Sequence, residues 1–71
     1  MLQPMPDDIA AVLKQRNITS AYEARPAYQR NDYLAWIARA KRTDTREKRL
    51  SVMLDELAAG HGYMNMKWDG A

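Results

Sequence analysis

Two stretches of regularly spaced apolar residues, separated by a charged segment, are the strongest constraint on how this chain of 71 residues folds. The apolar side chains recur at steps of three and four residues, first at Tyr33, Trp36, Ile37 and Ala40 and then at Leu50, Met53, Leu54, Leu57 and Ala58. This spacing places side chains on one face of an α-helix, so it predicts two helices that share one core. The main core residues are expected to be Tyr33, Trp36, Ile37, Leu50, Leu54 and Leu57.

The segment between these stretches carries charges where one continuous helix would need apolar residues. Extending the first apolar face beyond Ala40 by similar steps leads to positions near Asp44 and Glu47, which are charged. We therefore predict a break over residues 42–44. The helix before it is expected to begin at residue 26 or 27 and to end at Arg42.

The start of the helix after the break has an unusual charge pattern. Thr43 or Asp44 can supply the side-chain oxygen of a helix cap, and Asp44 with Glu47 has the spacing of a capping box. Arg46 then lies in the first turn, where the helix dipole disfavours a cation by about 0.3–1 kcal/mol. We therefore expect an anion to offset the charge of Arg46.

Proline and asparagine divide the first part of the chain. Residues 1–5 are predicted to be an extended lead-in, because the prolines at positions 4 and 6 disfavour helix in the residue before them. A helix then follows as far as Asn17, and a short helix covers residues 18–24. Together with the two longer helices, these segments predict an all-α domain of four helices that takes in residues 1–71.

The end of the chain has an alternating pattern of large side chains. Gly60 is expected to end the last helix. Met64, Met66 and Trp68 alternate after it, and residues 61–71 are predicted to form an extended tail that packs these side chains on the helices. A short strand that pairs with the sheet edge of a partner is the alternative.

The composition excludes several classes of function. The chain has no cysteine and one histidine, so it has neither disulfides nor a cysteine-based zinc site, and a histidine metal site would need carboxylate ligands as well. It contains no glycine-rich phosphate loop and no motif of a known nucleophile. We expect no catalytic residue, no metal and no cofactor, and therefore no enzyme. The absence of a signal sequence and of a long apolar run predicts a cytoplasmic protein without membrane insertion.

One ordered motif spans the charged segment, with the residue pairs Trp36-Ile37, Ala40-Lys41 and Thr45-Arg46 followed by Arg49. It resembles the W-I, A-K, T-R, R signature of the bacterial YdeI/OmpD-associated family. The resemblance implies a small helical domain of bacterial origin without an established activity or catalytic residues. The family name suggests a link to envelope proteins, envelope stress or bacteriocin protection.

The charged segment is also the most basic part of the chain. Six basic residues and two acidic ones lie between positions 39 and 49. The free backbone N–H groups at a helix start, together with such cations, suit an anion. The candidate site for an anion or a partner consists of Lys41, Thr45, Arg46 and Arg49. The alternative, which we favour, is that Arg46 forms an internal ion pair with Asp8, Glu23 or Asp32.

These features lead to two hypotheses about function. The first is a non-enzymatic interaction module with a protein partner, which acts as a monomer or weak dimer through the basic segment. The alternative is weak, sequence-nonspecific binding of nucleic acid or another anion by the same basic residues, with Tyr63 or Trp68 stacking on bases.

Overall fold

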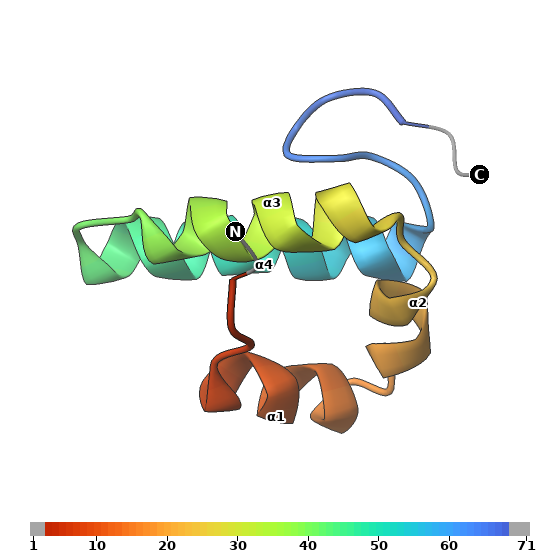
Figure 1. Cartoon of the computed structure of the whole chain (residues 1–71), viewed down its shortest axis with the longest axis horizontal. Coiled ribbons are helices and arrows are strands. Elements are labelled where there is room, and N and C mark those ends of the chain that lie inside the picture. The colour runs from red at the N-terminus through yellow and green to blue at the C-terminus, as the bar shows by residue number, and fades with distance from the viewer. Residues whose placement is uncertain (1–2, 69–71) are drawn as a thin grey trace.

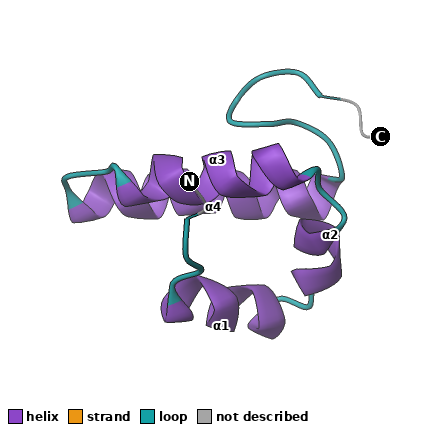
Figure 2. Cartoon of the chain, viewed as in Figure 1, coloured by secondary structure: helices purple, strands orange, loops and turns teal. Residues whose placement is uncertain are grey.

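The computed structural model describes residues 3–68, in which short loops join four helices (Figures 1 and 2). They are α1 (Asp7–Gln15), α2 (Thr19–Glu23), α3 (Ala27–Ala38) and α4 (Thr43–Ala59). The predicted all-α fold with four helices is confirmed. None of the helices in this part of the chain is both long and apolar enough to cross a membrane.

Helices α3 and α4 form an antiparallel hairpin that is the largest layer of the fold. Figure 1 shows α1 and α2 on one side of this hairpin and the segment after α4 on the other side. Asn17 separates α1 from α2 in the left-handed conformation, with φ of 59°, which explains why the first helix ends there. Gly60 ends α4 in the same conformation, with φ of 81°.

The core lies where α1 and α2 meet the hairpin. Four of the six predicted core residues are buried, whereas Trp36 and Leu50 are half-buried and pack against the edge of the core. On α3, Leu34 is buried in the core with Tyr33 and Ile37, whereas Trp36 packs against the edge of the core. The buried cluster comprises Ile9, Leu13, Tyr22, Tyr33, Leu34, Ile37, Met53, Leu54 and Leu57.

The break between α3 and α4 occurs earlier than predicted. Helix α3 ends at Ala38 rather than at Arg42, and α4 begins at Thr43 as expected. The N–H of Ala40 donates to the carbonyl of Ile37 at 3.2 Å, a bond across three residues that tightens the last turn. The predicted extension of α3 to Arg42 is therefore wrong, and residues 39–42 form the loop.

The segment after α4 is a tight turn and not the extended tail that the alternating pattern predicted. Tyr63 and Met66 exchange two backbone hydrogen bonds of 2.9 and 2.8 Å. Between them, Met64 and Asn65 have φ of 50° and 67°, the left-handed pair found in two-residue hairpin turns. Local pairing thus replaces the predicted extended tail and the strand that was its alternative.

The turn packs on the helices as expected for the tail. The N–H of Gly62 donates to the carbonyl of Trp68 at 2.7 Å, which closes the base of the turn. Tyr63 and Met64 pack against the core, whereas Met66 is 55% exposed. The last predicted tail residues, 69–71, lie outside the described part of the chain. We call residues 62–68 the C-terminal turn.

Candidate functional site

Arg46, the residue whose charge required an anion, forms a forked ion pair with Asp8 of α1. Its two terminal nitrogens lie 2.9 and 3.2 Å from the two carboxylate oxygens. The hydrogen bonds from Arg46 hold the pKa of the Asp8 carboxyl below its ordinary value. Both side chains remain partly exposed, at 32% and 60%. Arg46 therefore fastens α4 to α1, as the internal alternative proposed.

Arg49 is held against the end of α3. Its Nη1 donates to the backbone carbonyl of Trp36 at 2.7 Å, and its guanidinium lies 5.3 Å from the centre of the Trp36 ring. Carbonyls in the last turn of a helix lack a partner within the helix. Arg49 supplies that partner and covers the ring at the same time, which joins α4 to α3.

The start of α4 is stabilised differently from the prediction. Arg42 occupies the cap position, and no side chain accepts a hydrogen bond there in the manner of a helix cap. The Asp44 carboxylate instead accepts from the neighbouring N–H of Thr45 at 2.9 Å and from Arg42 at 3.1 Å. The predicted cap by Thr43 or Asp44 is therefore wrong, and a carboxylate of the chain itself lies beside this helix start.

A pocket of about 220 Å³ lies beside Trp36 and brings two of the four candidate residues together. Thr45 and Arg49 line it, whereas Lys41 is exposed on the loop and Arg46 turns toward Asp8. Two cations and no carboxylate line this pocket, so its surface is positively charged. The lining residues are Trp36, Thr45, Lys48, Arg49, Val52 and Asn65, and we call it the Trp36 pocket.

Arg25, which the sequence did not identify as a candidate, is a buried cation at the junction of α2 and α3, with 4% of its surface exposed. Its guanidinium donates to the backbone carbonyls of Gly62 at 2.6 Å and Glu56 at 3.0 Å, and to the side chain of Gln29 at 3.1 Å. It also lies 4.2 Å from the centre of the Trp68 ring. Arg25 therefore connects the C-terminal turn to the helices.

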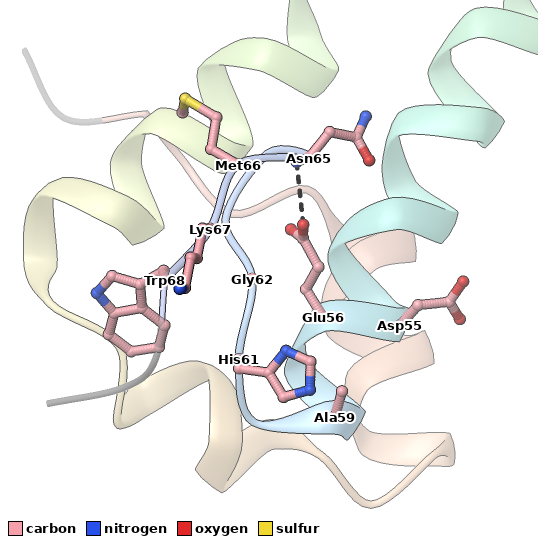
Figure 3. A pocket seen from close by; sticks show the side chains of 9 residues that line it. All are labelled: Asp55, Glu56, Ala59, His61, Gly62, Asn65, Met66, Lys67 and Trp68. Atoms are coloured by element: carbon pink, nitrogen blue, oxygen red, sulfur yellow. Dashed lines mark hydrogen bonds between the residues drawn. The ribbon is translucent and has the colours of Figure 1, made fainter.

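Glu56 of α4 is the second residue that the sequence did not identify, and Figure 3 shows its carboxylate directed at the C-terminal turn. It accepts from the N–H of Met64 at 2.8 Å and from the N–H of Asn65 at 3.0 Å. The hydroxyl of Tyr33 donates to the same carboxylate at 2.5 Å. A single carboxylate thus binds the backbone of the two non-glycine residues of the turn that have left-handed conformation.

Tyrosine hydroxyls complete the contacts between the turn and α3. Tyr63 donates to the carboxylate of Asp32 at 2.5 Å, and its ring meets the ring of Tyr33 edge to face at 5.5 Å between centres. Burial, followed by the hydrogen bond to a carboxylate, raises the pKa of both tyrosines above the ordinary value. Both hydroxyls therefore stay protonated and act as donors at neutral pH.

A pocket of about 410 Å³ opens between the C-terminal turn and the end of α4, as Figure 3 shows. Its wall is mixed in charge, with acidic residues on α4 and a lysine on the turn. Across residues 3–68, no group of three His, Asp or Glu side chains is placed to hold a metal ion. The lining residues are Asp55, Glu56, Ala59, His61, Gly62, Asn65, Met66, Lys67 and Trp68.

No local pattern distinguishes Arg25 or Glu56 from the other charged residues of the chain. Two of the partners of Arg25 are backbone carbonyls 31 and 37 residues away, and backbone carbonyls leave no mark in a sequence. The one usable signal was Asn65, a residue type that tolerates positive φ and favours turns.

The chain was also compared with known proteins. No curated protein and no solved structure matches it. The family model described as bacteriocin-protection, YdeI or OmpD-associated matches residues 4–60, which include the charged segment and all four helices. Because this match covers more than half of the sequence, the chain belongs to the bacteriocin-protection, YdeI or OmpD-associated family.

Proposed function

We propose that this domain is a non-enzymatic interaction module of the bacterial cytoplasm, and that the Trp36 pocket binds a negatively charged segment of a partner protein. The observation that carries the proposal is the lining of this pocket, in which Lys48 and Arg49 flank an aromatic ring and no carboxylate is present. An acidic side chain with an apolar neighbour is complementary to such a surface.

The distribution of charge in the basic segment of residues 39–49 supports the same partner class. Arg39, Lys41 and Lys48 are exposed, and none of them forms an ion pair with a described residue. Trp36 packs against the core but is only half-buried, so the accessible part of this residue offers an apolar contact to a partner. Aromatic and cationic residues of this kind are enriched among the residues that dominate protein interfaces.

A protein segment fits this surface better than nucleic acid. The nucleic-acid hypothesis requires a row of free arginines and exposed aromatic rings. Arg42 and Arg46 are paired with Asp44 and Asp8, respectively. The ring of Trp68 lies against Arg25. Fewer groups are therefore free to neutralise phosphates or to stack on bases.

The family description also favours binding over catalysis. It names protection from bacteriocins and association with OmpD, and association is a binding function. Within the described residues, two of the four candidate side chains, those of Arg46 and Arg49, form contacts that fix helices to one another. We therefore propose that the domain has no catalytic activity of its own.

The proposal can be tested with labelled peptides of about ten residues and fluorescence anisotropy. A peptide of alternating Glu and Leu should bind the full chain, and a matched peptide of alternating Lys and Leu should not. Lys48→Glu should weaken binding of the acidic peptide about fivefold or more, because it reverses a charge that lines the pocket. Lys14→Glu, the same charge change on the exposed side of α1, is the matched control.

If both variants lost the same affinity for the acidic peptide, binding would depend only on the net charge of the protein. This result would contradict the assignment of the Trp36 pocket as the binding site. A titration with a single-stranded oligonucleotide tests the alternative, because phosphate binding weakens steeply between about 50 and 200 mM salt. Tighter binding of the oligonucleotide than of the acidic peptide at the higher salt concentration would overturn the proposal.

A further inference from the structure

The backbone of the C-terminal turn forms hydrogen bonds with side chains of the helical part of the chain. Glu56 accepts the two N–H groups at the tip of the turn, and Arg25 donates to a carbonyl at its base. Such contacts depend on the conformation of the bound segment more than on its side chains. A surface with these groups therefore recognises the backbone conformation of a tight turn.

Two aromatic residues of the turn add side-chain contacts at its two ends. The hydroxyl of Tyr63 donates to Asp32, and the ring of Trp68 lies over the Arg25 guanidinium. Between them, Met64 packs against the core, whereas Asn65, Met66 and Lys67 are exposed. The surface thus contacts an aromatic residue just before the tip, the tip itself and an aromatic residue after it.

The residues that make this surface and the segment that covers it belong to different parts of the chain. Arg25, Asp32, Tyr33 and Glu56 all lie within residues 4–60, which match the family model, whereas the turn lies after them. The pocket of about 410 Å³ also separates part of the turn from α4. The turn therefore follows the region matched by the family model and is partly separated from α4 by this pocket.

We propose that the surface formed by Arg25, Asp32, Tyr33 and Glu56 is a peptide-binding site for a tight turn, and that residues 62–68 occupy it as an intramolecular ligand. The external partner is a protein that presents a two-residue hairpin turn preceded by an aromatic residue. This inference goes beyond the Trp36 pocket and concerns a different set of side chains.

The experiment uses the full chain and a labelled peptide with the sequence of residues 62–68, closed into a ring by two added cysteines so that the turn is preorganised. Asn65→Pro in the protein breaks the native turn, since proline requires φ near −65° where Asn65 has 67°. The variant should bind the peptide at least about tenfold more tightly than the original chain, whose site is already filled.

Two further variants locate the binding site. Glu56→Gln added to Asn65→Pro should weaken peptide binding about tenfold, because the charged acceptor for two N–H groups is lost. Lys14→Glu added to Asn65→Pro should leave it unchanged, because Lys14 is exposed on α1 and lines neither pocket. A matched peptide with proline at the position of Asn65 should not bind.

Circular dichroism of Asn65→Pro shows whether the helices remain folded without the native turn. If the helices are lost, the turn is a required part of the fold and not an exchangeable ligand, and the proposal is wrong. Retained helices without peptide binding, or binding that survives Glu56→Gln, would equally overturn it.

Discussion

Asp8 and Arg46 join the first helix to the last through a forked ion pair, with nitrogen to oxygen distances of 2.9 and 3.2 Å. The pair offsets the cation that Arg46 places in the first turn of α4, and it uses an acidic residue from the first turn of α1. This contact thus offsets the unfavourable charge at the start of α4 and fixes how α1 and α4 pack against each other.

This pair should make stability depend on acid. The pair lowers the pKa of Asp8 in the folded state. Asp8 therefore contributes stability that is present above its unfolded pKa of about 3.8 and is lost as the pH falls through the folded pKa. At pH 7, Asp8→Asn should lower the free energy of unfolding by less than about 1 kcal/mol, since the pair is partly exposed. Urea unfolding at neutral pH and in acid should show this difference disappearing at low pH.

Asp7→Asn is the matched control for this measurement. Asp7 lies in the same helical turn and forms no ion pair with a described residue, so it reports the interaction with the helix dipole alone. If the two variants lost the same stability, the pair with Arg46 would have no net effect.

Arg49 should contribute more to stability than its exposed neighbour. Arg49→Ala removes the donor to the Trp36 carbonyl and the contact with its ring, and we expect a loss of about 1–2 kcal/mol in the free energy of unfolding. Lys48→Ala should change it by less than about 0.5 kcal/mol. Chemical unfolding of both variants checks this, and similar losses in both would contradict the role given to Arg49.

The two glycines that flank His61 should respond differently to alanine. Both have positive φ, of 81° and 88°, so each substitution costs about 1–2 kcal/mol in backbone strain. A Cβ at Gly60 meets nothing within 4 Å, whereas one at Gly62 lies 3.1 Å from the side chain of Glu56. Thermal unfolding should therefore show a larger loss for Gly62→Ala.

A second background separates the two causes. In a Glu56→Ala protein the close contact is absent, so Gly62→Ala should cost no more there than Gly60→Ala. A difference that persisted in this background would mean that the Glu56 side chain is not what restricts Gly62.

Tyr33 and Tyr63 should make the fold sensitive to alkali. Burial and the hydrogen bonds to Glu56 and Asp32 raise their folded pKa values above the unfolded value of about 10. Their stabilising effect is thus complete below pH 10 and is lost as the pH rises through the folded pKa. Tyr63→Phe should make the free energy of unfolding less dependent on pH above 10. If the free energy of unfolding of Tyr63→Phe kept the same dependence on pH above 10, the Tyr63 hydroxyl would not be a source of the sensitivity to alkali.

The fold was largely predictable because local signals agree with one another. Apolar spacing identified α3 and α4, and Asn17 and Gly60 marked helix ends where a left-handed residue is needed. The half-burial of Trp36 was not predictable, because it depends on how distant parts of the chain pack around α3. Periodicity defines a face of a helix but not the element that packs on it.

The candidate site was predictable only in part. The positive end of the helix dipole predicted that Arg46 needs an anionic partner, and Asp8 was one of three candidate carboxylates. The sequence could not decide which of the three is the partner. It missed the C-terminal turn, because Met64 is an uncommon residue at positive φ and the carboxylate that stabilises it lies eight residues away. Contacts between a side chain and a distant backbone leave no sequence pattern.

The length of chain between paired residues also has a consequence for folding kinetics. Arg49 reaches Trp36 across 13 residues, whereas Arg46 reaches Asp8 across 38. Shorter loops close at lower entropic cost, so we expect the α3 and α4 hairpin to form in the transition state and α1 to dock afterwards. In stopped-flow experiments, Arg49→Ala should slow refolding, while Asp8→Asn should mainly accelerate unfolding.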